Sequence, residues 1–334
     1  MAAVPVAGPV DLAGSLDVFR RSGDDLLDRW DGRLWLRAVP VGGRMVGVAA
    51  RPTGTVADPA LLVAVEPGAE AAAGDPAPLV TADADAAAAG RALAGAFPTA
   101  PEALATLAAD DPVVAPIAAR FPGITPVLQP DLLTAVVRSI SAQQITLRFA
   151  AVLRGRLARR YGHRHRVPVR HGGPAGPPDA EVWSLDPERL AAAEVADLRE
   201  LQFSTSKAVA VVAFAGAVAE GRIDLRELAA LEDEAVVDRL VAFPGIGRWT
   251  AEWLLARTLG RPRVVAGDLG VRKAVGAAYL DGRMPSEAEV RAVTAHWGAA
   301  AGVAQQLLLH WLYTDTPATS RRSATRPGRS SRPG

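Results

Sequence analysis

The stretch "AFPGIGRWTAEWLL" (residues 242–255) decides how the middle of this chain folds. Apolar residues at helical spacing run into Pro244-Gly245-Ile246-Gly247, and an amphipathic pattern resumes at Arg248. Pro244 has no N–H and the two glycines allow positive φ, so the four residues predict a tight hairpin between two helices. The unpaired N–H groups of the hairpin and of the next helical turn attract an anion, above all a phosphate.

The composition narrows the chemistry that the chain can perform. Its 334 residues suffice for two or three domains, and the absence of cysteine excludes disulfides, thiol nucleophiles, Cys-ligated zinc and iron–sulfur clusters. The first residues include Asp11 and no basic region, so we do not expect a signal peptide. The longest apolar run, residues 208–219, is too short to span a bilayer. We therefore expect a cytoplasmic protein with no membrane partner.

Strand-like and helical patterns divide the chain into two parts. Residues 34–65 show short alternating β-prone runs between Gly and Pro, which predict a small antiparallel sheet. From residue 101 onward the patterns are helical, with long runs over residues 131–161, 187–201 and 225–243. The sequence thus predicts an α+β fold. It comprises a small β-containing N-terminal domain with an Ala/Pro-rich linker (1–100), a two-lobed, all-helical body (101–317) and an Arg-rich disordered tail (318–334).

A segment rich in His, Arg, Gly and Pro lies inside the helical body. It reads "GHRHRVPVRHGGPAGPP" (residues 162–178) and contains three histidines. Their spacing fits no closed metal site, so we expect a basic, solvated loop.

The segment "RPRVVAGDLGVRKAV" (residues 261–275) contains a candidate catalytic carboxylate. Asp268 stands just before a helical pattern that opens at Leu269, so it is expected to cap that helix. The positive helix end would also keep the carboxylate ionised and able to act in a cleft. The two roles are compatible in one residue.

Aromatic side chains accompany the hairpin and the last helix. Trp249 and Trp253 lie four residues apart on one helical face, and Trp311 and Tyr313 stand near the end of the last helical pattern. Core packing is the commoner use of Trp. A cleft lined by Trp with a carboxylate at its floor would instead suit a flat, electron-poor ring.

Two adjacent glutamines interrupt the apolar stretch "RSISAQQITLRF" (residues 138–149). A buried amide must find hydrogen-bond partners, so the pair lies either on a solvated face or at the mouth of a cleft. If the pair lies at the mouth of a cleft that binds nucleic acid, Gln144 could fill the gap left by a base displaced from the duplex.

These motifs together resemble a known family. The segments "FPGIGRWTA", "GDLGVRK", "AQQIT" and "LLLHWLYTD" stand in the chain in the order found in the helix-hairpin-helix DNA glycosylases. Within that superfamily the chain is similar to the bacterial DNA-3-methyladenine glycosylase II family over residues 101–317.

The resemblance assigns roles to individual residues. It implies that Asp268 is the catalytic carboxylate and that Gln144 is a wedge inserted into the minor groove. The implied lesion pocket is lined by Trp249, Trp253, Trp311, Tyr313 and Gln143. The implied contacts to the DNA backbone come from Pro244, Gly245, Ile246, Gly247, Arg248 and Thr250. No cofactor is required, and a structural Na+ or K+ would be held by the main-chain carbonyls of Val241, Phe243 and Ile246.

The activity that the resemblance implies is base-excision repair. The enzyme would flip cationic alkylated purines such as 3-methyladenine and 7-methylguanine out of double-stranded DNA and hydrolyse their N-glycosidic bond, as a monomer on the bacterial nucleoid. Strand-cutting members carry a nucleophilic lysine where Trp249 stands, so a monofunctional glycosylase is expected. One alternative is a non-catalytic helix-hairpin-helix protein that binds damaged DNA, which would not need Asp268. Another is a glycosylase for oxidised or deaminated bases, which would need polar pocket groups that the sequence does not locate.

Overall fold

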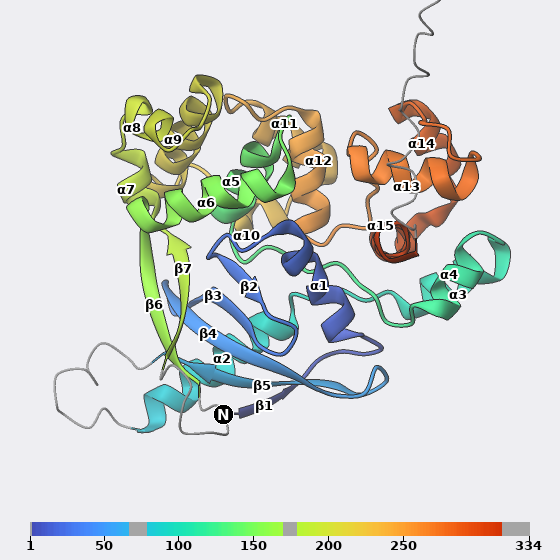
Figure 1. The fold of residues 1–334 in the computed structure, drawn as a ribbon, viewed down its shortest axis with the longest axis horizontal. Coiled ribbons are helices and arrows are strands. Elements are labelled where there is room, and N and C mark those ends of the chain that lie inside the picture. Colours follow the sequence, from blue (N-terminus) through green and yellow to red (C-terminus); the bar gives the residue numbers. More distant parts are fainter. Residues whose placement is uncertain (1, 67–78, 170–178, 316–334) are drawn as a thin grey trace, which may run out of the picture.

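The N-terminal domain is built on a five-stranded sheet. The computed structural model describes residues 2–66, 79–169 and 179–315 (Figure 1). All neighbouring strands are antiparallel and follow the order β1-β5-β4-β3-β2. The strands are β1 (Ala2–Pro5), β2 (Asp28–Trp30), β3 (Trp35–Val41), β4 (Arg44–Gly54) and β5 (Pro59–Val65). The sheet expected over residues 34–65 is therefore confirmed, and it gains an edge strand on each side.

Two helices cover one face of this sheet. Helix α1 (Leu12–Ser22) begins at Asp11, whose side chain accepts the N–H of Gly14 at 2.9 Å. Helix α2 (Leu79–Ala94) lies against β1, β3 and β5. Between helices and sheet is an apolar core that includes the fully buried Trp35 and Leu16.

A second β-hairpin covers the opposite face of the sheet and corrects two expectations (Figure 1). Strand β6 (Gly162–Pro168) stands where a solvated loop was expected and pairs with β7 (Asp179–Leu185), so the body is not all-helical. Val167 and Val182 pack on Leu36 and Ala49 because β3 and β4 are apolar on both faces and need a cover on each. Residues 170–178 of the expected loop lie outside the described residues.

One histidine of this hairpin is part of the core. His165 is 7% exposed, and its ring nitrogens lie 2.8 Å from Glu66 Oε1 and 2.9 Å from Ser184 Oγ. Both nitrogens are thus satisfied by the fold. Among the described residues, no group of three or more His, Asp or Glu side chains could hold a metal ion.

The helical part forms two lobes, each with its own apolar core. The first lobe comprises α5 (Leu132–Ala142), α6 (Leu147–Tyr161), α7 (Pro187–Ala191), α8 (Val195–Glu200), α9 (Thr205–Ala219), α10 (Leu225–Ala229), α11 (Asp233–Val241) and α12 (Arg248–Arg257). The second comprises α3 (Pro101–Asp110), α4 (Val114–Arg120), α13 (Leu269–Tyr279), α14 (Glu287–Val293), the 3-10 helix η2 (Ala295–Ala300) and α15 (Ala301–Asp315). Chain segments from both ends of the body therefore build the second lobe, and the α+β class is confirmed.

Three long helices expected from the sequence are each broken in two. The breaks separate α5 from α6, α7 from α8, and α10 from α11. Local capping residues that helical periodicity does not reveal start the second member of a pair, as Thr146 does by accepting the N–H of Phe149. No helix in the described part of the chain is long and apolar enough to cross a membrane.

Candidate active site

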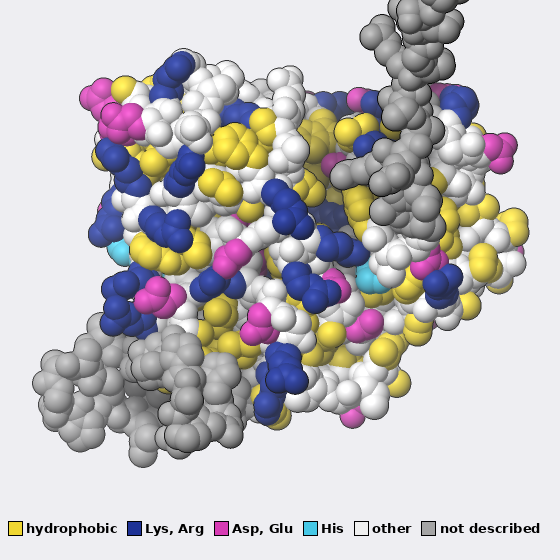
Figure 2. Space-filling view, in the orientation of Figure 1, with side chains coloured by type: hydrophobic (Ala, Val, Ile, Leu, Met, Phe, Trp, Pro, Cys, Tyr) yellow, Lys and Arg dark blue, Asp and Glu magenta, His cyan; other side chains and the backbone are white. Residues whose placement is uncertain are grey.

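A cavity of about 1070 Å³ lies where the two lobes and the N-terminal domain meet. Its walls come from α1, from the break between α5 and α6, from the first turns of α12 and α13, and from α15. On the face drawn in Figure 2, Lys and Arg side chains gather around the hollow between the lobes. The volume is large enough for a small organic ligand.

Asp268 lies on the cavity wall as the N-cap of α13. Its Oδ1 accepts the N–H of Val271 at 3.0 Å, so the expected capping role is observed. The loop before it is fixed, since Asp268 N–H donates to the carbonyl of Val265 at 3.0 Å. The carboxylate therefore faces the cavity from a rigid position at a positive helix end.

Trp249 and Trp253 line the same cavity from α12. Trp249 packs against Gly267, where an added Cβ would approach Trp249 Cδ1 to 2.8 Å, so only glycine fits beside the indole. The indole Nε1 of Trp249 is buried and has no hydrogen-bond partner among the described residues. Gly267, which precedes Asp268, has no side chain because the indole of Trp249 occupies the space that one would need.

The last helix contributes Tyr313 to the cavity but not Trp311. Tyr313 is 55% exposed and lines the cavity, whereas Trp311 packs against the core of the second lobe. Residues two positions apart on an α-helix point about 200° apart, so both cannot face one cavity. The expected place of Trp311 in the lesion pocket is therefore wrong.

The two glutamines form the break between α5 and α6 at the edge of the cavity. Gln144 is exposed and adopts a left-handed φ of 58°, which is costly for any residue but glycine. Lys207 holds the break in place, because its Nζ donates to the carbonyls of Ser141 at 3.0 Å and Gln143 at 2.6 Å. Gln143 in turn lies beside the hairpin, its Nε2 3.4 Å from the carbonyl of Gly245.

The hairpin presents its backbone to solvent while its apolar side chain anchors it. Pro244, Gly245 and Gly247 are exposed, whereas Ile246 is 4% exposed and belongs to the core of the first lobe. Gly245 has a φ of 73°, and a Cβ there would lie 2.6 Å from the Cβ of Ala210. The N–H groups at the start of α12 thus remain available for an anion.

Two of the expected backbone-contacting side chains are occupied within the protein. Thr250 is 1% exposed, and its hydroxyl lies 3.4 Å from Ser139 Oγ. Arg248 donates to Glu234 at 2.9 Å and to Glu252 at 3.2 Å. Their side chains therefore bind the protein itself, and their N–H groups lie in the first turn of α12.

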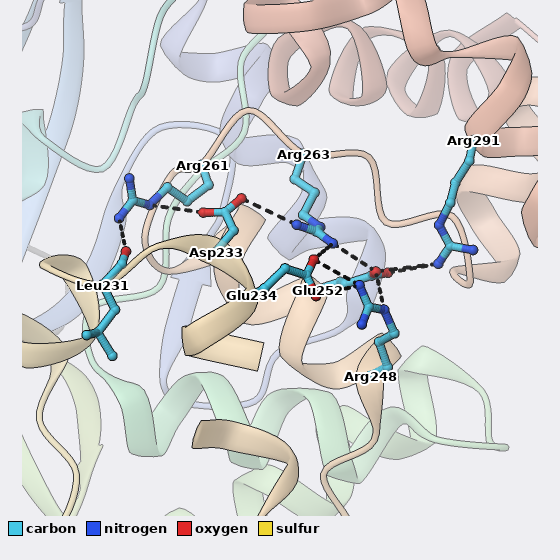
Figure 3. A network of polar contacts seen from close by, with 8 residues as sticks. All are labelled: Leu231, Asp233, Glu234, Arg248, Glu252, Arg261, Arg263 and Arg291. Atoms are coloured by element: carbon cyan, nitrogen blue, oxygen red, sulfur yellow. Dashed lines mark hydrogen bonds and ion pairs between the residues drawn. The ribbon is translucent and has the colours of Figure 1, made fainter. Parts of the chain in front are cut away.

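Arg248 belongs to a network of ion pairs that the sequence did not reveal (Figure 3). At its centre Glu252, 1% exposed, accepts from Arg263 at 3.2 Å and from Arg291 at 3.4 Å as well as from Arg248. Arg263 stands in the segment that leads to Asp268, and Arg291 lies on α14 of the second lobe. One buried carboxylate thus joins the hairpin helix to the segment before Asp268 and to the second lobe.

A second buried charge cluster closes the cavity on the side of the N-terminal domain. Arg138 of α5 donates to Asp25 at 2.9 Å and to Asp28 at 3.0 Å. Arg154 of α6 donates to Asp25 at 2.8 Å, and Arg37 of β3 pairs with Asp28. Burial opposes the charge of Asp25, but Arg138 and Arg154 outweigh it and hold the pKa of this carboxyl below its usual value. The cluster locks the N-terminal domain onto the helices that carry the cavity.

Polar groups from α12 and α15 complete the cavity wall. Arg257 Nη1 donates to Gln306 Oε1 at 2.8 Å, and Gln305 Oε1 accepts the N–H of Val265 at 2.7 Å. Burial lowers the pKa of Arg257 to about 10, and the charge of Asp268 opposes that fall. Sequence reasoning missed these residues, although a Gln-Gln pair inside "VAQQLLL" is the same signal that drew attention to Gln143 and Gln144.

The hairpin carbonyls fit a monovalent cation in part. Among the described residues, the carbonyls of Val241 and Ile246 accept no turn or cap hydrogen bond, whereas that of Phe243 accepts the N–H of Ile246 at 3.2 Å. A carbonyl oxygen has two lone pairs, so this bond leaves Phe243 able to bind an ion.

Comparison with known protein families identifies what the chain is similar to. Residues 137–299, which include the glutamine break, the hairpin and Asp268, match the model of the HhH-GPD superfamily of base excision DNA repair proteins. Over these residues the chain is similar to this superfamily. The resemblance seen in the sequence is therefore confirmed.

Individual HhH-GPD relatives extend this comparison. DNA-3-methyladenine glycosylase of Bacillus subtilis (strain 168) is 25% identical over 193 residues, 57% of this chain and 60% of the relative. DNA-3-methyladenine glycosylase 2 of Escherichia coli (strain K12) is 30% identical over 138 residues, 41% of this chain and 43% of the relative. The chain spans about half the length of the curated relatives that it matches.

A solved HhH-GPD structure matches nearly the whole chain. The 3-methyladenine DNA-glycosylase from Archaeoglobus fulgidus superposes with a TM-score of 0.73 at 25% identity, covering 94% of this chain and 99% of that one. The likeness therefore includes the N-terminal sheet as well as the helical lobes.

Proposed function

We propose that the chain is a monofunctional DNA glycosylase that removes alkylated purines, including 3-methyladenine and 7-methylguanine, from double-stranded DNA. The observation that carries this proposal is the placement of the Asp268 carboxylate in a cavity walled by Trp249 and Trp253, beside an exposed hairpin. The names of its relatives support the same substrate class.

The hairpin supplies binding that is independent of DNA sequence. Its exposed backbone and the first N–H groups of α12 would bind a phosphate, an interaction that carries no base information. A target base is then turned out of the stack, which is least costly for a damaged one. Gln144 at the cavity edge is placed to fill the gap that the base leaves.

The cavity would favour a cationic base over a neutral one. Alkylation at N3 of adenine or N7 of guanine puts a delocalised positive charge on the ring. The indole faces of Trp249 and Trp253 attract such a ring through cation–π interaction, and the Asp268 carboxylate adds a charge of opposite sign. Normal bases gain less from either contact.

Asp268 would stabilise the transition state. As the bond between the sugar C1′ and the base nitrogen breaks, its electron pair neutralises the base and positive charge develops on the sugar. A fixed carboxylate stabilises that charge and can orient the water that adds to C1′. A cationic base needs no general acid to leave, so one carboxylate suffices.

A strand-cutting step is not part of the proposal. Trp249 occupies the position expected for a nucleophilic lysine, and the Nζ of Lys207 is engaged by two carbonyls. Lys273 lines the cavity but is exposed on α13. Absence of a covalent complex after borohydride treatment is expected, and a trapped complex would contradict monofunctional action.

Three further properties belong to the same proposal. The protein acts as a cytoplasmic monomer on the nucleoid, needs no cofactor, and binds Na+ or K+ through the carbonyls of Val241, Phe243 and Ile246. The cation would neutralise the carbonyl end of α11 next to the phosphate site.

The decisive experiment measures base release from methylated duplex DNA by wild type and Asp268→Asn. Release of 3-methyladenine and 7-methylguanine by wild type, lost in the variant while DNA binding persists, is expected. Equal release by both proteins would remove Asp268 from the mechanism. Intact DNA binding without release by either protein would favour a non-catalytic DNA-binding protein or another lesion class.

A further inference from the structure

Tyr313 brings a hydroxyl group to the cavity wall that carries Asp268. The residue lines the cavity, is 55% exposed, and its hydroxyl makes no hydrogen bond to a described residue. Asp268 is partly exposed on the same wall, and in the described structure only its Oδ1 accepts a hydrogen bond, from Val271. Both side chains therefore keep polar atoms available to a molecule in the cavity.

Gly270 shows how near the two groups lie to each other. A Cβ atom at this position would be 3.0 Å from Asp268 Oδ1 and 3.1 Å from the hydroxyl oxygen of Tyr313. The two oxygens are therefore no farther apart than the sum of these distances, yet no direct hydrogen bond joins them in the described structure. One water molecule, hydrogen-bonded to each oxygen at about 2.8 Å, spans such a separation.

The glycine at position 270 leaves room beside these two oxygens. Gly270 stands in the first turn of α13 and does not have a left-handed φ, so its backbone angle does not require glycine. Glycine is also a poor helix former, and local propensity would favour alanine. What glycine provides is space, because any side chain would begin within 3.1 Å of both oxygens.

The ring of Tyr313 is held in place from the N-terminal domain. Arg21 of α1 also lines the cavity and lies over the ring, with its Cζ 5.9 Å from the ring centroid. Partial burial, and secondly the charge of Asp268, raise the pKa of Tyr313, so the hydroxyl stays protonated at neutral pH. The phenol is thus a neutral group fixed close to the charge of Asp268.

Two acceptor oxygens at this separation favour a nucleophile with two hydrogens to donate. Water donates one hydrogen to Asp268 and the other to the Tyr313 oxygen, which leaves a lone pair of the water oxygen for the sugar. As the bond from C1′ to the base breaks, its electron pair moves to the base, the water oxygen bonds to C1′, and a proton of the water passes to Asp268. Methanol has one O–H hydrogen, so it satisfies only one of the two acceptors.

We infer that Tyr313 positions the attacking water together with Asp268, its hydroxyl oxygen serving as the second acceptor. The inference rests on the proposed glycosylase function and deepens it, because it assigns a second residue to the step in which water adds to C1′. Gly270 provides the space in which that water is held.

The test measures which nucleophile the enzyme uses. Wild type and Tyr313→Phe, which keeps the ring and removes only the hydroxyl, act on dimethyl-sulfate-treated duplex DNA in buffer that contains methanol. Single-turnover release of base is followed, and mass spectrometry gives the share of abasic sites that carry a methoxy group at C1′. Tyr161→Phe is the matched control, because the Tyr161 hydroxyl lies 3.3 Å from another carboxylate, Asp197, and does not line the cavity.

The methoxy share should rise about threefold or more in Tyr313→Phe, with slower base release, and should keep its wild-type value in Tyr161→Phe. If wild type releases base and Tyr313→Phe keeps the wild-type share, whether or not its release is slower, the inference is overturned while the glycosylase function stands. A wild-type share equal to the molar fraction of methanol would overturn it as well, because the site would then not favour water. If wild type releases no base, the proposed function fails, and the inference fails with it.

Discussion

The carboxylate of Asp268 accepts a hydrogen bond from the N–H of Val271 at 3.0 Å, so one side chain both caps α13 and faces the cavity. The cap fixes the rotamer of the carboxylate without a protein cation within ion-pair distance among the described residues. The structural and the chemical roles of this residue can therefore be separated by substitution.

Asp268→Asn and Asp268→Ala should differ in stability but not in activity. Asparagine caps a helix as well as aspartate, so its free energy of unfolding should change by less than about 0.5 kcal/mol, whereas alanine should lose about 1 kcal/mol. Both variants lack the charge and should lose base release. Urea unfolding and single-turnover release of base measure the two effects. Wild-type release by the asparagine variant would show that the charge is not required.

Gln144→Gly should stabilise the fold but slow the release of damaged bases. Glycine adopts the left-handed backbone at this position without strain, so the free energy of unfolding should rise by about 1 kcal/mol. Release of damaged bases should slow, because no side chain remains to occupy the vacated stack. Asp281→Gly is the matched control, since Asp281 is exposed in a turn with a φ of 51°. It should gain similar stability with unchanged release; if both variants keep full activity, the wedge role is wrong.

Glu252→Gln should destabilise the junction between the lobes. The substitution removes the charge that three arginines share at a buried position, and we expect a loss of about 2 kcal/mol in the free energy of unfolding. Base release should also slow, because Arg263 holds the segment that leads to Asp268 (Figure 3).

The control for this change is Glu287→Gln. Glu287 pairs with Arg291 at 3.5 Å, but its side chain is 53% exposed, so its loss should cost less than about 1 kcal/mol. Equal effects of the two substitutions on unfolding would mean that Glu252 contributes no more than a surface ion pair.

His310 should make the stability of the protein fall in mild acid. Burial, and secondly the charge of Arg21, lower the pKa of His310, and its Nδ1 has no partner in the described structure. The unfolded chain therefore takes up a proton near pH 6.5 that the folded protein resists, so stability present above that pH is lost as the pH falls toward the folded pKa. Urea unfolding between pH 8 and pH 5 should show a shallower loss in His310→Asn than in wild type. Parallel curves for the two proteins would exclude this histidine as the source.

The sequence predicted those features that depend on a few neighbouring residues. Pro244 and the hairpin glycines determine local backbone angles, and Asp268 precedes its helix as a capping residue does in any fold. The α+β class followed from the change of periodicity near residue 101. Each of these signals acts within one or two helical turns, so no knowledge of the rest of the chain was needed.

Contacts between distant segments could be assigned only from the tertiary structure. Strands β6 and β7 form because the far face of β3 and β4 needs a cover, and Trp311 turns away from the cavity because α15 packs with that face inward. Arg154 meets Asp25 across 129 positions, and Gln129 lies beside Arg257 through a single backbone hydrogen bond. Side-chain type and spacing specify which groups are available, but burial against a partner that is remote in sequence decides which of them face the cavity and which become part of the core.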